Sequence, residues 1–400
     1  MSLDLMKKEE VNWKMDKEYK YTFSVDQSGI YVIVVSARAR SWFQNVRKFA
    51  SFFGDDNLAV RINGTGFPKL SGARGEFNGE ASWNGNKLKG LKQVNLFVVF
   101  LERGEQNLEF ISSGSPLLES IEIHRVSKNK ISVDPSEYGT EDGNRRPWFN
   151  VLTQNVGIVN VYAKATANPK TGKDDNDLQI RINGIREQNT APKAHKYWFW
   201  CGRVLRGQLK IFKRTVGLKP GFNYIEFWAD GAPVFNKLDV HVTMSDRIPS
   251  VDDPLWTGDF YDDSEEIILA RVIFGEARSQ SREAKIWVAA TVINRRAAKT
   301  WWGKTVHEVI LMDQQFESFN KDNDNRFVIE NPLSDPTQKE DWIECFNIAK
   351  DILRGSIQNP TKATHFHDPR QTQEDFMRKF VPDGEFLKKI DNLYFYWSPN

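Results

Sequence analysis

The sequence predicts a multidomain fold in which two antiparallel β-sandwich modules, of jelly-roll type, precede a mainly α-helical domain. Three observations lead to this prediction. A diverged repeat occupies the first two-thirds of the chain, hydrophobic residues inside each copy alternate with a period of two, and the hydrophobic period becomes helical after Ser264. We expect the modules at residues 1–133 and 145–246, and the helical domain at residues 260–400.

The repeat is anchored by the tetrapeptide Arg-Ile-Asn-Gly, which occupies residues 61–64 and recurs 120 positions later at 181–184 (181 minus 61). Downstream, Leu-Glu-Phe at 108–110 matches Ile-Glu-Phe at 225–227, an offset of 117 (225 minus 108). In both copies aliphatic residues alternate with polar ones up to the Asn-Gly pair. This pattern predicts a half-buried strand that ends in a hairpin turn, because Asn and Gly tolerate positive φ.

Composition and charge narrow the classes of function. The net charge of +2 gives no case for nucleic acid binding. No run of about 18 apolar residues is present, so we expect no membrane span, and the first twenty residues lack the apolar stretch of a signal peptide. The two cysteines, Cys201 and Cys345, lie far apart and predict neither a disulfide framework nor a zinc ligand set. We therefore expect no metal and no other cofactor.

The chain is rich in aromatic residues, with 13 tryptophans and 27 phenylalanines. The predicted modules resemble carbohydrate-binding modules in architecture, and indole faces can cover the apolar face of a sugar. The alternatives are that the modules are spacers or interaction domains and that the indoles lie in their cores. The candidate sugar platforms are Trp42, Trp83, Trp198, Trp200 and Trp228.

Ser264 followed by two glutamates predicts the start of a helix, because serine caps free amides and acidic residues suit the positive end of the helix dipole. On that helix Glu276 falls on the same face as Leu269, Val272 and Ile273. A carboxyl on a core-facing stripe is partly desolvated, which raises its pKa. Such a group can protonate a glycosidic oxygen near neutral pH. The alternative is a simple ion pair with Arg278 or Arg295.

Five segments in order then resemble the SleB-type cell wall hydrolase family, which includes spore-cortex-lytic enzymes. The resemblance covers about residues 265–397, where Gln-Phe is followed by Glu rather than Ser and where His-Asp replaces Tyr-Asn after His-Phe. The segments are LARVIFGEAR at 269–278, VAATVINR at 288–295, the run from Thr305 to Ile310, Gln315-Phe316, and TKATHFHDP at 361–369. With a glutamate at the end of its first helix, the domain also resembles the lysozyme-like fold.

The resemblance implies that Glu276 is the catalytic acid of an enzyme that cleaves peptidoglycan between N-acetylmuramic acid and N-acetylglucosamine. In the lytic transglycosylase reaction the same carboxylate then deprotonates the C6 hydroxyl to give an anhydro sugar. Such an enzyme acts as a secreted or cell-envelope protein on glycan strands, and the β modules would hold it to these or to another polysaccharide. The substrate-binding residues implied are Gln315, Phe316, Ser318, His365, Arg278 and Asn294.

Three alternatives stay open at this point. In a hydrolytic muramidase, Glu317, Asp313 or Glu308 would hold a water. In a zinc amidase, His365 and His367 would share a strand face, with Asp368 or His307 completing the site. In a non-catalytic wall-binding protein, the enzyme domain would have lost its activity.

Overall fold

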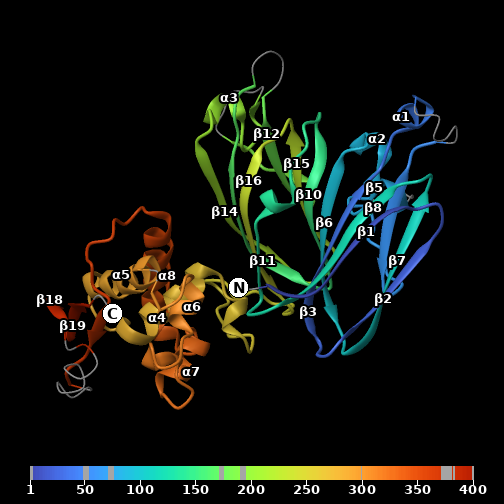
Figure 1. Cartoon of the computed structure of the whole chain (residues 1–400). Helices are drawn as coiled ribbons and strands as arrows, with labels where there is room; N and C mark the ends of the chain where they lie inside the picture. Colours follow the sequence, from blue (N-terminus) through green and yellow to red (C-terminus); the bar gives the residue numbers. More distant parts are fainter. Residues whose placement is uncertain are drawn as a thin grey trace. The chain divides into compact units, whose positions relative to one another are not determined.

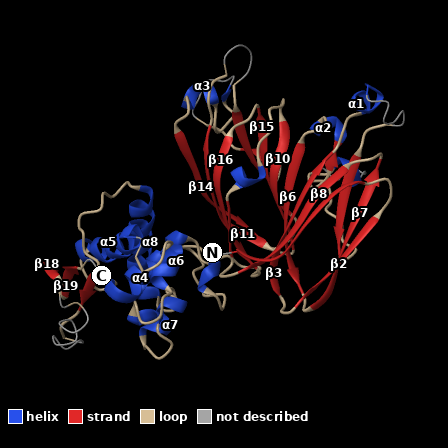
Figure 2. Cartoon of the chain, in the orientation of Figure 1, coloured by secondary structure: helices blue, strands red, loops and turns tan. Residues whose placement is uncertain are grey.

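The computed structural model describes residues 3–47, 54–70, 76–170, 175–189, 195–298, 300–370, 381 and 383–398. The chain divides into two compact units, residues 1–246 and 247–400 (Figure 1). Strands make up most of the first unit and helices dominate the second, as Figure 2 shows. Within the described ranges, no helix is both long and apolar enough to cross a membrane.

The first unit is built from antiparallel strands with a few short helices between them. Its strands are β1 (Leu3–Lys14), β2 (Tyr19–Val25), β3 (Gly29–Arg38), β4 (Asn57–Ile62), β5 (Trp83–Asn84), β6 (Lys92–Leu101), β7 (Gly104–Ser113), β8 (Leu117–Val126), β9 (Lys130–Val133), β10 (Arg146–Gln154), β11 (Gly157–Thr166), β12 (Asp177–Ile182), β13 (Ile185–Arg186), β14 (Leu209–Leu218), β15 (Asn223–Asp230) and β16 (Val234–Thr243). Its helical turns are α1 (Trp42–Arg47), η1 (Glu76–Asn78), α2 (Gly85–Leu88), η2 (Pro135–Tyr138) and α3 (Gly202–Leu205).

The two halves of this unit repeat one strand arrangement. In the first half, β1-β8-β3-β6 form one side and β2-β7-β4-β5 the other; in the second half, the corresponding sets are β14-β11-β16-β9 and β10-β15-β12-β13. The sequence placed strand β9 with the first module, but in the structure β9 pairs with β16 of the second module. It takes the position there that β1, which pairs with β8, has in the first module. The sequence repeat therefore corresponds to a structural repeat.

The two halves share one continuous sheet. Strand β6 pairs with β10 in parallel, from Phe149 opposite Val94 to Gln154 opposite Val99, and this pairing joins two four-stranded sheets into one of eight strands. The sequence did not predict this parallel pair. Its consequence is visible in β3, where Ile30 and Val32 contribute to one hydrophobic core while Tyr31 and Ile33 contribute to another. A strand buried on both faces has a continuous apolar run in place of alternation.

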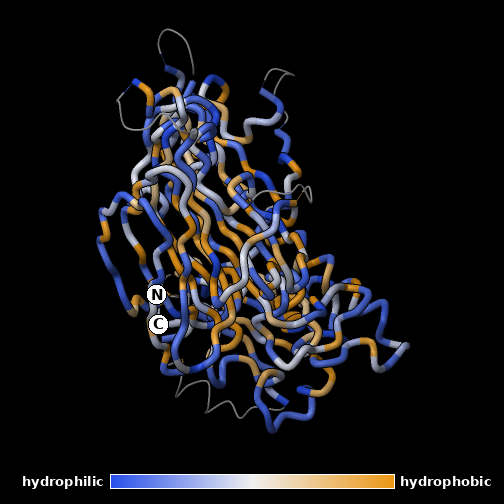
Figure 3. Tube along the Cα trace, turned by 90° about the vertical axis from the view of Figure 1, so that its right-hand side faces the viewer, coloured by the Kyte–Doolittle hydropathy of each residue, from blue (hydrophilic) through white to orange (hydrophobic). Residues whose placement is uncertain are grey.

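Figure 3 shows these apolar runs along the strands, with hydrophilic segments at the loops. The Asn-Gly turns adopt the predicted backbone: φ is 49° at Asn63 and 77° at Gly64, and 46° at Asn183 and 78° at Gly184. Both turns thus occupy the left-handed region that Asn and Gly tolerate best.

Two of the five candidate sugar platforms are wrong. Trp83 and Trp200 are fully buried, and their indole N–H groups donate to the backbone carbonyls of Gln93 (2.8 Å) and Lys210 (2.9 Å). A buried indole keeps its N–H satisfied in this way. By contrast, half of the surface of Trp42 is exposed. 

Trp198 and Trp228 are partly exposed. The guanidinium of Arg181 lies 3.8 Å from the centre of the Trp228 ring, so one face of that indole is already covered.

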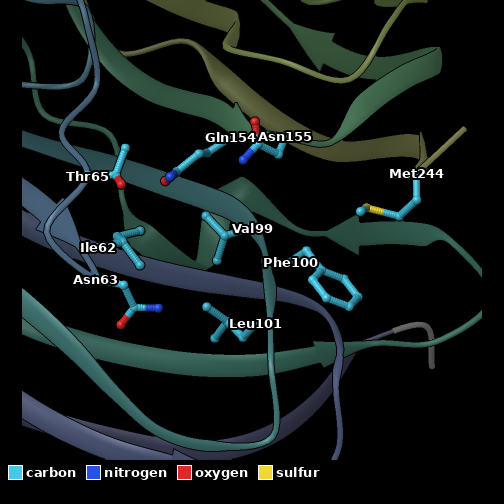
Figure 4. Close-up of a pocket in the computed structure, with 9 residues that line it drawn as sticks. All are labelled: Ile62, Asn63, Thr65, Val99, Phe100, Leu101, Gln154, Asn155 and Met244. Carbon is cyan, nitrogen blue, oxygen red and sulfur yellow. The ribbon is translucent and has the colours of Figure 1, made fainter. Parts of the chain in front are cut away.

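A hollow of about 170 Å³ opens where the two halves meet, lined from β6 by Val99, Phe100 and Leu101 (Figure 4). Ile62, Asn63, Thr65, Gln154, Asn155 and Met244 complete the lining. These side chains are aliphatic, aromatic or uncharged polar groups, so the hollow offers no acid or base for catalysis.

The second unit packs its helices around one core. Its elements are η4 (Phe260–Asp262), α4 (Glu265–Ala277), α5 (Arg282–Ala298), α6 (Val306–Ile310), η5 (Glu317–Phe319), α7 (Asn325–Glu330), η6 (Pro336–Gln338), α8 (Lys339–Arg354), β17 (His365–His367), β18 (Glu385–Ile390) and β19 (Leu393–Trp397). The three strands form a small sheet in the order β17-β19-β18.

Helix α4 begins as predicted, with the Ser264 hydroxyl accepting a hydrogen bond from the Ile267 amide at 3.2 Å. From Ile267 to Gly275 every residue of the helix is buried, which includes Arg271. Such a helix is apolar all round rather than amphipathic. The sequence predicted one buried face, whereas the other helices of the unit cover α4 on all sides.

Arg271 is fully buried on this helix, and its hydrogen-bond partners lie within the second unit. It donates to both carboxylate oxygens of Asp263, at 2.7 and 3.0 Å, to the carbonyl of Pro254 at 2.6 Å, and to the carbonyl of Ile329. A guanidinium satisfied in this fork geometry can stay charged in a dry core. The pair holds the segment before α4 and the end of α7 against the helix.

Candidate active site

Glu276 occupies the penultimate position of α4, where the buried helix meets the surface. Its side chain is partly exposed, while its neighbours Gly275 and Ala277 are buried. At Gly275 a methyl group would come within 2.6 Å of the Ser318 Cβ and 2.7 Å of the Ile329 Cγ2. The glycine therefore lets the segment at Ser318 approach the helix next to the glutamate.

Ser318 holds the carboxylate directly. Its hydroxyl donates to Glu276 Oε1 at 2.7 Å, and its backbone amide donates to the same oxygen at 3.1 Å. Ser318 lies in η5, the single turn that follows the Gln315-Phe316 pair, and its side chain is buried. Two donors on one oxygen fix the rotamer of Glu276.

Several effects act on the pKa of Glu276. Burial of the carboxyl is the largest and raises the pKa, while the two Ser318 hydrogen bonds lower it. The negative charge of Glu317 raises it further, and the positive charge of Arg295 lowers it. The net effect is a pKa above the ordinary value, because desolvation disfavours the carboxylate more than the donors favour it. The sequence predicted this direction from the helix face alone.

Arg295, which the sequence analysis considered only as an ion-pair partner of Glu276, is part of this site. It is buried on α5, where burial lowers its pKa to about 10, so the guanidinium remains charged at neutral pH. It donates to the carbonyl of Thr364 at 2.6 Å and to Gln315 Oε1 at 3.3 Å, and it lies 5.1 Å from the centre of the Phe316 ring. The signal that could have found it is its place beside Asn294 in the VAATVINR segment.

Four of the six predicted substrate-binding residues gather around Glu276 and Arg295. Ser318 contacts Glu276, and Gln315 and Phe316 contact Arg295. His365, at the start of β17, is influenced by the Arg295 charge; burial and that charge lower its pKa to about 4, so its imidazole is neutral at pH 7.

Asn294 and Arg278 make other contacts. The Asn294 amide donates to the carbonyls of Thr361 (2.9 Å) and Ala363 (2.8 Å) and so fastens the loop before β17. Arg278 donates to Asn325 Oδ1 at 3.1 Å, on α7. In the described contacts Asn294 fastens backbone near the site and Arg278 holds a side chain of α7, so neither is bonded to the Glu276 carboxylate itself.

The carboxylates named for a hydrolytic reaction differ in their surroundings. Glu308 closes a capping box at the start of α6, where it accepts from the Thr305 and Lys304 amides. Asp313 and Glu317 are exposed, and Glu317 is the one whose charge acts on Glu276.

The histidines named for a zinc amidase are engaged elsewhere. His365 Nδ1 lies 3.0 Å from the Thr364 hydroxyl, and His367 stacks on Tyr396 at 5.6 Å. His307 Nε2 lies 3.1 Å from the Asp263 carbonyl. Within the described ranges these side chains do not form a group of three with metal-ligand spacing.

Comparison with known proteins identifies the second unit. Residues 279–396 match the model of the Cell Wall Hydrolase family, in agreement with the resemblance to the SleB-type family. The matched range starts three residues after Glu276 (279 minus 276). Such a domain supports peptidoglycan-degrading activity in general and leaves the type of bond cleavage open. No curated protein matches the chain.

Two solved structures resemble this chain weakly. One is titled peptide-N(4)-(N-acetyl-β-D-glucosaminyl) asparagine amidase; it is 11% identical, the match covers 61% of this chain and 96% of the other, and the TM-score is 0.19. The second, PNGase F, a glycosylasparaginase from Flavobacterium meningosepticum, has the same identity and coverage with a TM-score of 0.18. We draw no conclusion from a likeness at these TM-scores.

Replacing Ser318 with alanine is expected to raise the pKa of Glu276 further. The hydroxyl donates to the charged form of the carboxyl, so its loss favours the protonated form. The measurement is a carbon-13 NMR titration of the glutamate carboxyls, in which Glu276→Gln identifies the signal. Ser279→Ala, at an exposed position nearby, is the control and should leave the titration unchanged. An unaltered or lower pKa in Ser318→Ala would contradict the assigned hydrogen bond.

Proposed function

Taking the cell wall hydrolase domain at residues 279–396 as the premise, we propose that the chain cleaves peptidoglycan outside the cytoplasm, at the bond between N-acetylmuramic acid and N-acetylglucosamine. Glu276 is the catalytic acid. The observation that carries the proposal is this carboxyl at the end of a buried helix, with a raised pKa and one oxygen fixed by Ser318. 

The first step is donation of the Glu276 proton to the glycosidic oxygen. A raised pKa keeps the acid protonated near neutral pH, which this donation requires. As the proton leaves, negative charge develops on the carboxylate. The two Ser318 donors and the charge of Arg295 then stabilise the anion, so the same groups that hold the side chain also favour the transition state.

In the second step we propose that the Glu276 carboxylate accepts the proton of the C6 hydroxyl of the muramic acid, whose oxygen attacks C1 and closes an anhydro ring. One carboxyl thus acts first as acid and then as base, and no second carboxylate is required. Gln315, held at 3.3 Å by Arg295, and the neutral imidazole of His365 are placed to bind sugar hydroxyl and amide groups.

Hydrolysis is the second candidate, and the position of Glu317 favours it. This exposed carboxylate acts electrostatically on Glu276, and in a hydrolytic reaction it would orient the attacking water. Paired carboxylates are the usual arrangement in glycosidases that use water. The products distinguish the two reactions, since water leaves a reducing muramic end and the C6 hydroxyl leaves an anhydro end.

We propose further that the β modules hold the enzyme to polysaccharide, and that Trp42 and Phe43 in α1 form part of the contact. Both side chains are more than half exposed, at 51% and 57%. Adjacent exposed rings are unusual on a monomeric surface and provide apolar faces for sugar rings.

Glu276→Gln should abolish the release of muropeptides from purified peptidoglycan, by a factor of at least about 10². Mass spectrometry of the released products is the measurement. Anhydro-muropeptides from the unmodified chain support the transglycosylase, and Glu317→Gln should then leave the products unchanged. Reducing ends that disappear in Glu317→Gln would instead support hydrolysis. Equal release by Glu276→Gln and the unmodified chain would exclude Glu276 as the acid.

Gly275→Ala should lower kcat by roughly 10- to 100-fold, because the added methyl displaces Ser318 and with it the carboxylate. KM should change less than kcat, since Gln315 and His365 interact with Arg295 rather than with Gly275. Turnover of a soluble glycan fragment measures both constants. Gly29→Ala is the matched control, as a Cβ there meets nothing within 4 Å. Full activity in Gly275→Ala would show that the close approach of Ser318 is not needed.

Trp42→Ala should weaken the binding of the full chain to insoluble peptidoglycan several-fold without altering turnover of a soluble fragment. The reason is that the substitution removes an exposed ring far in sequence from Glu276. Co-sedimentation with cell wall sacculi measures the binding. Leu209→Ala, which removes an exposed aliphatic side chain of the same unit, is the control. Identical binding by both variants would argue against α1 as a glycan contact.

A further inference from the structure

The second β module brings together three side chains that the proposed catalysis does not use. A carboxylate oxygen of Asp177, an imidazole nitrogen of His195 and the thiol of Cys201 all lie within 4.8 Å of one another. Among the residues that the structure describes, this is the single group of three or more such side chains with that spacing. We propose that Asp177, His195 and Cys201 form a zinc-binding site.

The backbone explains why these residues meet. Leu178 and Trp200 form an antiparallel bridge, with N–H to O distances of 2.8 and 3.0 Å in the two directions. The bridge sets Asp177 opposite Cys201, since their sequence neighbours are paired. The Trp198 amide donates to the His195 carbonyl at 3.1 Å, which closes a turn shortly before Trp200 and Cys201. The histidine thus reaches the site from this turn.

The chemistry of the three groups suits zinc. Thiolate, imidazole and carboxylate are the ligands that this ion takes, at roughly 2.0–2.3 Å, which puts ligand atoms about 3.3–3.8 Å apart in a tetrahedron. The three ligand atoms lie within 4.8 Å of one another, a limit about an ångström above this spacing, and rotation of the side chains can close that difference. Cys201 and Asp177 are 1% and 5% exposed, while His195 is partly exposed, so a fourth position faces solvent beside the histidine.

The charge of a divalent cation also suits this group of side chains. Asp177 and Cys201 lie next to each other across the bridge and would both bind zinc as anions, so that two negative charges balance the two positive charges of the ion. The Gly202 amide donates to Asp177 Oδ1 at 2.6 Å, as the Gly85 amide donates to Asn57 Oδ1 in the first module, and this contact orients the carboxylate.

The first module supplies an internal comparison. There Asn57 and Asn84 form the matching cross-strand pair, with Leu58 and Trp83 in the places of Leu178 and Trp200. The Asn84 side chain caps α2 by accepting from the Lys87 amide, whereas Cys201 forms no such cap on α3.

The same backbone thus carries two amides in one module and a carboxylate with a thiol in the other. At the matching pair of positions, two groups that bind zinc therefore replace two amides that do not. Bound zinc would connect His195 to the start of α3. It would thereby also hold the segment with Tyr197 and Trp198, which follows His195.

The test uses the full chain and variants that copy the first module. Cys201→Asn and Asp177→Asn place at these positions the residues that the matching positions already carry, so the fold should be retained; His195→Gln removes the third ligand. Each protein is loaded with zinc chloride, dialysed and analysed for metal by mass spectrometry. Cobalt(II) loading then reports on the ligands, because a cobalt–thiolate bond gives a charge-transfer band in the near ultraviolet.

We expect one zinc ion per chain in the unmodified protein and in Cys345→Ser, the control that removes the other buried cysteine. The variants Cys201→Asn and Asp177→Asn should bind at least about 100-fold more weakly, and Cys201→Asn should lose the charge-transfer band. Circular dichroism checks folding, and His195→Gln carries the test if either of the others unfolds. Failure of the unmodified chain to retain zinc, or equal retention by the ligand variants, would overturn the proposal.

Discussion

The buried ion pair between Arg271 and Asp263 is the constraint on which the second unit depends. Charges in a dry core are tolerated only when every donor has a partner, and this guanidinium draws its partners from the segment before α4, the residue Pro254 and the end of α7. The result is a helix enclosed on all sides. Because α4 cannot shift, the carboxyl at its end sits at a fixed depth, and that depth raises the pKa of Glu276. The packing that holds α4 in place therefore also contributes to the raised pKa of Glu276.

Local rules predicted the parts of the fold that depend on short stretches of sequence. Ser264 caps its helix, the Asn-Gly pairs adopt positive φ, and Glu276 was singled out from the spacing of apolar residues around it. The parallel pairing of β6 and β10 could not be found in this way. It joins strands about fifty residues apart, and a strand buried on both faces by tertiary packing loses the alternation by which strands are recognised.

The same limit applies to the candidate site. The resemblance of the five segments to the SleB-type family placed Ser318 and Gln315 near Glu276. It could not distinguish side chains that contact the carboxylate, such as Ser318, from side chains that hold loops, such as Asn294. Arg295 was considered only as an ion-pair partner of Glu276, because an arginine on a helix is ordinarily a surface charge and only packing shows that this one is buried. Trp83 and Trp200 were misplaced for the opposite reason, since a tryptophan in a sequence does not show whether its ring finds a core.

The eight-stranded sheet has a consequence for how the protein avoids aggregation. Every open sheet edge is a template for pairing with another chain. By pairing β6 with β10, the duplicated modules remove two long apolar edges at once, and the edges of the resulting eight-stranded sheet are β13, only two residues long, and β1, which carries consecutive charges from Lys7 to Glu10. In this sheet, duplication doubled the number of strands without doubling the exposed edge. A single module released by proteolysis would present β6 or β10 as an unpaired edge strand. We therefore expect the two halves to be degraded together.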